Sequence, residues 1–174
     1  MDQVPEILES ANDNNGSRTI IKTVLGPGAT VVSHYHTLFT ETFEVLEGEI
    51  DVWNGDSKIT LTVGQSATIA KTIIHRWLVG AKETIVNLTF IPGNIDVERA
   101  MKIIKGLGLQ QDGFYTQLSA TDKDGLVLVA IIADLTHSNT IGDIKKELNK
   151  LYESEGSKIE QVKTELLKKY SNNH

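Results

Sequence analysis

Residues 28–48 carry the sequence GATVVSHYHTLFTETFEVLEG, and this stretch decides how the chain folds. It places His34 and His36 one residue apart, and Glu41 follows after a short turn segment, residues 37–40. In a β-strand the side chains at positions i and i+2 point to the same face, roughly 6–7 Å apart. If this segment is a strand, both imidazoles can therefore reach one ion.

Two further residues extend this pair to a possible ligand set. A second strand after the turn would carry Glu41 back alongside the histidines, and His75 opens another apolar segment, residues 74–79. A His-x-His pair alone is weak evidence, because surface histidines pair by chance. The four residues together predict a divalent metal site, since imidazole nitrogens and carboxylate oxygens both bind such ions.

The flanking sequence has a residue pattern typical of a β-domain. Between residues 18 and 92, short β-branched segments alternate with turns that contain glycine, and Asn54-Gly55 is a pair favoured in tight hairpins. The expected strands are 19–25, 29–36, 41–46, 49–53, 58–63, 66–70, 74–80 and 84–91. This many short strands in one segment favours an antiparallel sandwich or barrel over a βαβ fold.

After Pro92-Gly93 the apolar residues change to helical spacing. Asn94 is a good helix cap, and residues 100–107 repeat with the i, i+3, i+4, i+7 period. The apolar run 126–133 suits a buried helix or a strand, and we favour a helix. A third helix is expected from about residue 144, with Gly156 breaking it, and the capping box at Ser157–Glu160 opens a fourth.

These patterns predict three parts of the chain. Residues 1–17 form an N-terminal arm, residues 18–92 form the β-barrel, and residues 93–174 form a helical extension that packs on the barrel or on a dimer mate. The fold class is mainly β, followed by C-terminal helices. We therefore expect a homodimer in which the barrel carries the chemistry.

Composition limits the partners of the chain. The 174 residues have a net charge of −6 and contain no cysteine, which disfavours nucleic-acid binding and excludes thiolate metal sites. The longest apolar run, residues 126–133, is far shorter than the roughly 20 residues that cross a bilayer. The polar N-terminus is unlike a secretory signal, so we expect a cytoplasmic protein without membrane contact.

The spacing of Gly28, His34, His36, Glu41 and Gly48 matches the first signature motif of the cupin superfamily, which this chain resembles. The match has no departure.

The second cupin motif is matched only in part. Gly64 and His75 stand at the right distance, but Ala70, Thr72 and Val79 replace the Pro, Gly and Asn of the motif. The turn before His75 is therefore expected to differ from the family's turn, although the ligand is present.

The resemblance implies a double-stranded β-helix, or jelly-roll, barrel of two sheets. It implies His34, His36, Glu41 and His75 as ligands of one divalent transition metal, for which iron, manganese, nickel, zinc and cobalt are the candidates. The helical tail also resembles that of small one-barrel cupins with a C-terminal helical extension, in pattern rather than in motif.

Function follows from the site rather than from the fold. Our first hypothesis is a metal-dependent enzyme acting on a small polar or anionic metabolite, such as a dioxygenase, isomerase or decarboxylase. The second is a non-catalytic module that binds or senses a small molecule, and the third is a structural metal site in an interaction protein. Phe43 and Trp77 share the inward phase of Glu41 and His75, so they are candidates for a pocket wall, although filling the core is the simpler role.

Overall fold

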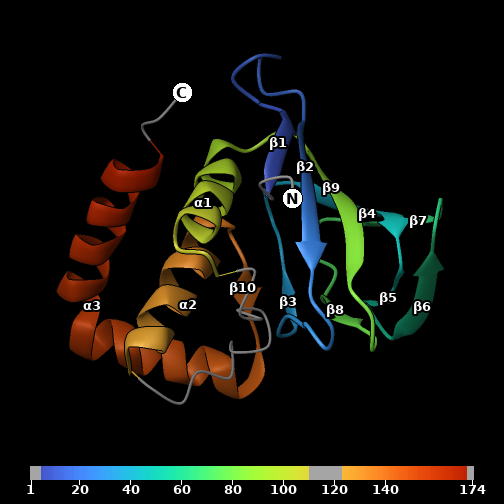
Figure 1. Ribbon diagram of the computed structural model, residues 1–174. Coiled ribbons are helices and arrows are strands. Elements are labelled where there is room, and N and C mark those ends of the chain that lie inside the picture. The colour runs from blue at the N-terminus through green and yellow to red at the C-terminus, as the bar shows by residue number, and fades with distance from the viewer. Residues whose placement is uncertain (1–4, 110–122, 172–174) are drawn as a thin grey trace.

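A computed structural model describes residues 5–109 and 123–171. Two antiparallel sheets face each other, and the helices lie together on one side of them (Figure 1). The first sheet has the strand order β1 (Glu6–Glu9), β2 (Thr19–Leu25), β9 (Thr84–Ile91), β4 (Thr40–Glu47) and β7 (Ser66–Ile69). The second has the order β10 (Asn139–Thr140), β3 (His34–Tyr35), β8 (His75–Val79), β5 (Glu49–Asn54) and β6 (Ser57–Thr62). The predicted jelly-roll barrel with a C-terminal helical extension is confirmed.

The barrel interior is built by strict alternation along the strands. In β2 and β9 every second residue is buried, and the residues between them are partly exposed. Two facing sheets bury one side of each strand, so this period of two is what the arrangement requires. The buried positions of β4 and β8 include Glu41 and His75, which places polar ligands among apolar core residues.

The strand expected over residues 29–36 is much shorter than predicted. Thr30 makes an isolated bridge to Leu78, and only β3 forms a regular ladder. The carbonyl of Ser33 accepts from the Ile141 N–H at 3.3 Å, and the carbonyl of Val32 accepts from the His34 ring. Residues 29–31 do contact β8, since the Val79 N–H donates to the Ala29 carbonyl at 2.8 Å, but the Thr30↔Leu78 pair is shifted by one residue from the His34↔His75 pair, so the ladder is interrupted.

The predicted N-terminal arm contains a strand in its described part. β1 pairs with β2 at the sheet edge, and the following turn is held by Glu98 of the first helix. The buried Glu98 carboxylate accepts hydrogen bonds from the Ser10 hydroxyl, the Ala11 N–H and the Thr19 hydroxyl. This contact joins the N-terminal segment to the helical extension.

Helix α1 (Ile95–Gly106) begins where the sequence predicts, with the Asn94 side chain accepting from the N–H groups of Asp96 and Val97. Helix α2 (Lys123–Leu135) confirms that the apolar run 126–133 is helical. None of the helices in the described ranges is long and apolar enough to cross a membrane.

The predicted break at Gly156 is wrong, because α3 (Gly142–Tyr170) runs through it as one helix. Glycine in a helix interior costs only about 1 kcal/mol, and the apolar stripe continues past it. Leu148 and Leu151 are buried before Gly156, and Ile159 is buried after it. Figure 1 shows that α3 nevertheless changes direction along its length.

The helical extension also contributes to the barrel sheet. After α2 the chain turns at His137 and forms β10, which pairs with β3 through Asn139↔Tyr35 and Thr140↔His34. Residues of the extension therefore lie directly beside the strand that carries the first two histidines.

Candidate metal centre

The structure brings the four predicted ligands to one place. β3 and β8 are adjacent, and His34 is paired directly with His75 across the ladder. His36 follows β3, while Glu41 comes from β4 in the opposite sheet. All four residues are buried, with exposed fractions between 1% and 7%.

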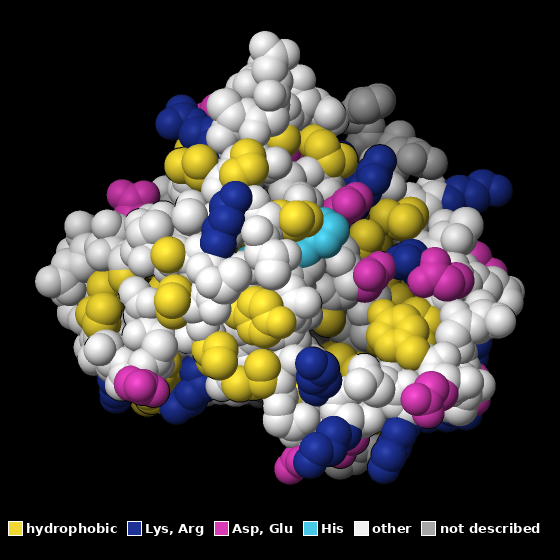
Figure 2. Space-filling model, turned by 180° about the vertical axis from the view of Figure 1, so that it is seen from behind, with side chains coloured by type: hydrophobic (Ala, Val, Ile, Leu, Met, Phe, Trp, Pro, Cys, Tyr) yellow, Lys and Arg dark blue, Asp and Glu magenta, His cyan; other side chains and the backbone are white. Residues whose placement is uncertain are grey.

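The spacing of the donor atoms fits a metal ion. One ligand atom from each of the four residues lies within 4.8 Å of all the others. Ligands on opposite sides of an ion with 2.0–2.2 Å bonds are about 4 Å apart, so only a small contraction is needed. On the face opposite that of Figure 1, histidine contributes only a small patch of the surface (Figure 2).

Backbone carbonyls orient all three imidazoles in the same way. The Nδ1 atom lies 2.8 Å from the Val32 oxygen in His34, 3.1 Å from the His137 oxygen in His36, and 3.0 Å from the Ile73 oxygen in His75. A carbonyl only accepts, so each Nδ1 must carry its proton. This leaves each Nε2 as the atom available to a metal, the arrangement in which an outer partner fixes a metal-binding histidine.

The Glu41 carboxylate faces two of these Nε2 atoms. Its Oε2 lies 3.0 Å from Nε2 of His75 and 3.3 Å from Nε2 of His36. With Nδ1 protonated, a neutral imidazole presents a lone pair there, so carboxylate and imidazole repel unless a cation lies between them. That cation is either an added proton or a metal ion.

The pKa shifts of the cluster describe this contact when the cation between Glu41 and the imidazoles is a proton. Burial would raise the pKa of Glu41, but hydrogen bonds from His36 and His75 bring it well below its usual range. Burial would lower the pKa of His75, but the bond to Glu41 raises it above its usual value. Burial and the neighbouring His75 and His36 lower the pKa of His34 to about 4, so His34 is neutral at pH 7.

The turn before His75 departs from the family's motif in sequence and has a backbone conformation that glycine adopts more readily than threonine. Thr72, where the cupin motif has glycine, adopts φ +68°, a value that β-branched residues rarely take. Its N–H donates to the His36 carbonyl at 2.7 Å, which ties this turn to the first ligand strand. The chain thus retains a glycine-like turn at the cost of backbone strain.

A cavity of about 90 Å³ adjoins the cluster, and its lining includes His34, His36 and Glu41. Phe43 and Trp77, the two predicted pocket candidates, both line it. The rest of the lining is mostly apolar.

One functional contact was missed by sequence reasoning. The His137 side chain lies outside the cluster, with its Nε2 atom 3.5 Å from Oδ2 of Asp96. Its backbone carbonyl, however, is the group that orients His36. A backbone carbonyl is not marked by residue type, and His137 lies 101 positions from His36. No local pattern in the sequence could therefore indicate this contact.

Comparison with known proteins agrees with the topology and the motif. Residues 22–91 match the family model of the cupin domain. The segment that matches folds as a cupin-type barrel. The match covers the strands from β2 to β9 and all four residues of the cluster.

Among curated proteins, this chain is 26% identical over 92 residues to quercetin 2,3-dioxygenase from Bacillus subtilis (strain 168). The aligned region is 53% of this chain but only 27% of that enzyme. The chain therefore spans about a quarter of the length of this relative.

Two solved structures resemble the barrel of this chain. A predicted oxalate decarboxylase from Thermotoga maritima is 20% identical, with a TM-score of 0.46 over 49% of this chain and 76% of that chain. A protein with a double-stranded β-helix domain from Klebsiella pneumoniae subsp. pneumoniae is 20% identical, with a TM-score of 0.45 over 52% and 77% of the two chains.

Replacing Thr72 by glycine should stabilise the metal-free protein. The substitution removes the Cβ that makes the φ of +68° unfavourable, so the free energy of unfolding should rise by about 1 kcal/mol. Urea denaturation measures this change. Thr62→Gly in the extended strand β6 is the control and should lower stability. Equal losses in the two variants would contradict strain at Thr72.

Zinc affinity should depend on pH through His75. In the metal-free protein the Glu41–His75 pair stabilises the fold between the lowered pKa of Glu41 and the raised pKa of His75. Zinc must displace the His75 proton, so its association constant should rise about tenfold per pH unit until that pKa is passed. Competition with a calibrated chelator between about pH 5 and 8 measures this. A flat response would contradict the assignment of His75 as a ligand.

Proposed function

We propose that this chain binds a divalent transition metal through His34, His36, Glu41 and His75 and acts on a small molecule held at that metal. The reaction classes proposed are those of a metal-dependent oxygenase, isomerase or lyase. Iron, manganese, nickel, zinc and cobalt all accept this donor set. Binding of the small molecule and reaction would both take place inside the barrel.

One observation carries the proposal. Three imidazoles have their Nδ1 atoms held by carbonyls, and the Nε2 atoms of His36 and His75 face one carboxylate oxygen at 3.3 and 3.0 Å. Burying such a set without a cation is costly, because each uncompensated polar group costs a few kcal/mol. A divalent ion satisfies all of the inward-facing lone pairs at once.

Charge and ligand number favour a reactive site over a purely structural one. Three neutral imidazoles and one carboxylate leave a net charge of +1 on a site that holds a divalent ion. In octahedral geometry four protein ligands leave two positions for a small molecule. The cavity beside His34, His36 and Glu41 provides space for that molecule, which a closed structural zinc site would not need.

The protein residues have distinct roles in this proposal. A bound ion supplies Lewis acidity, which polarises an oxygen of the small molecule. Glu41 balances half of the ion's charge, and the carbonyls of Val32, Ile73 and His137 keep the imidazoles in the metal-binding tautomer. The apolar walls exclude water and so strengthen the electrostatic interaction between the ion and its ligand.

We also propose that the protein is a cytoplasmic homodimer and that it does not bind nucleic acid. The net charge of −6 and the absence of cysteine support the location and the lack of nucleic-acid binding. Exposed apolar side chains such as Ile73, Ile74 and Val63 provide surface for contact with a second copy.

The double variant His34→Ala/His36→Ala should lose stoichiometric metal. Two of the four donors disappear, so elemental analysis of untagged, metal-loaded protein should show less than a tenth of the metal bound by the unaltered chain. His137→Asn is the control, because its side chain lies outside the cluster and its orienting carbonyl remains. Unchanged metal in the double variant would refute the ligand assignment.

Cobalt should report an open coordination position. The visible absorption of Co²⁺-loaded protein should change on addition of azide, because an anion can enter a position that the four protein ligands leave free. Unaltered spectra at millimolar azide would indicate a closed site and would favour the structural role instead.

A further inference from the structure

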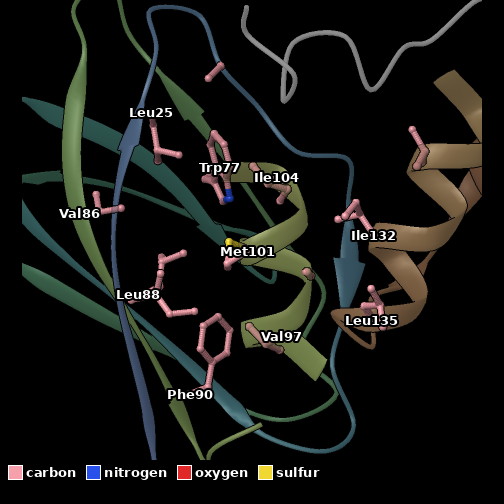
Figure 3. Packing of buried hydrophobic residues seen from close by; sticks show 14 of the residues in the cluster. Leu25, Trp77, Val86, Leu88, Phe90, Val97, Met101, Ile104, Ile132 and Leu135 are labelled. Atoms are coloured by element: carbon pink, nitrogen blue, oxygen red, sulfur yellow. The ribbon is translucent and has the colours of Figure 1, made fainter. Parts of the chain in front are cut away.

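The cavity beside the metal centre lies between two parts of the chain. The barrel contributes apolar side chains from β2, β4, β8 and β9, and the extension contributes Met101 of α1 and Val129, Ile132 and Ala133 of α2. Figure 3 shows Met101 directed toward the barrel strands near Leu88, with α2 beyond it. The helical extension thus forms one wall of the cavity, opposite the barrel strands.

The charge of this cavity is concentrated at one end. In the described parts of the chain its lining contains no lysine or arginine, and the only ionisable groups are those of the cluster. A second carboxylate on a ligand would therefore be buried against apolar walls without a partner, which is strongly unfavourable. One negative charge, in contrast, is matched by the net +1 of the loaded site.

A hydroxyl group lies next to the cluster on the extension side. Thr140 pairs with His34 in the antiparallel ladder, and both residues are buried on the inward face. Directly opposite residues have their Cβ atoms about 5 Å apart. Within the described segments the Thr140 hydroxyl has no hydrogen-bond partner, and its side chain lines the cavity. The neighbouring Thr136 hydroxyl, in contrast, is bonded to the Ile132 carbonyl and to Ser138.

We propose that the site takes a small monoanion with a hydrocarbon body, whose oxygen head binds the metal beside the Thr140 hydroxyl while its body fills the cavity walled by α1 and α2. This inference rests on the proposed function, because the head requires the bound metal. It narrows the polar or anionic ligand expected from the sequence to one with a single charged end. The cavity volume of about 90 Å³ suits a compact molecule rather than an extended one.

Two acids of equal size test the proposal on the full-length, zinc-loaded protein. 4-Methylpentanoate and succinate have the same number of non-hydrogen atoms and differ by one isopropyl group in place of a carboxylate. Calorimetric titration should show at least tenfold tighter binding of 4-methylpentanoate. Tighter or equal binding of succinate, or no binding of 4-methylpentanoate, would overturn the inference.

Metal content measured on the same samples distinguishes a failure of the proposed function from a failure of the proposed ligand class. A chain that retains no zinc would contradict the proposed function, and this inference with it. A chain that holds zinc but prefers succinate would contradict only the ligand class.

The role of the helical wall is tested on α2. Ala133→Leu adds bulk at the cavity lining and should weaken binding of 4-methylpentanoate at least tenfold while zinc content is unchanged. Asp134→Leu places the same side chain one position along the helix, where the residue is exposed and outside the cavity, and should leave binding unchanged. Equal effects of the two variants would overturn the placement of the ligand against α2.

The role of Thr140 is tested by an isosteric change. Thr140→Val removes the hydroxyl and should weaken 4-methylpentanoate binding about tenfold, the usual effect of one lost hydrogen bond, without loss of zinc. Thr140→Ser restores a hydroxyl and should recover most of the affinity. Full affinity in Thr140→Val would show that the hydroxyl does not contact the ligand.

Discussion

A carboxylate oxygen of one sheet, Oε2 of Glu41, faces imidazole nitrogens of the other sheet at 3.0 and 3.3 Å, and this contact requires a cation. The barrel brings these groups together because its two sheets each turn one face inward, and ligands occupy inward positions on both. Carbonyl groups hold the three imidazoles with Nδ1 outward, so rotation of the rings cannot relieve the repulsion. The apolar surroundings make the repulsion between the carboxylate and the imidazoles more costly when no cation is present.

Features that depend on local periodicity could be predicted from the sequence. The i, i+2 spacing of His34 and His36 and the inward phase of Phe43 and Trp77 follow from the alternation of side chains along a strand. The continuous course of α3 could not be predicted in this way. Glycine is a weak helix breaker, and whether Gly156 interrupts a helix depends on the packing of Leu151 and Ile159 on either side of it.

Thr72 shows that a residue other than glycine can occupy a left-handed backbone position in the turn before His75. A threonine at φ +68° persists only if its surroundings hold it there, and the 2.7 Å hydrogen bond from its N–H to the His36 carbonyl is one such restraint. The positive φ of Thr72 therefore lowers the stability of the turn that precedes His75. The sequence alone registers the missing glycine but not the positive φ at this position.

The helical extension and the metal centre form one physical unit. The loop after α2 supplies the carbonyl that orients His36, β10 places Thr140 opposite His34, and α1 and α2 wall the adjacent cavity. These contacts join residues about a hundred positions apart, which is why local patterns in the sequence did not indicate them. A shift of α2 would move the His137 carbonyl and the cavity wall together, so the geometry of the site and the space for its ligand depend on the same helix. The extension is for this reason part of the site rather than an appendage to the barrel.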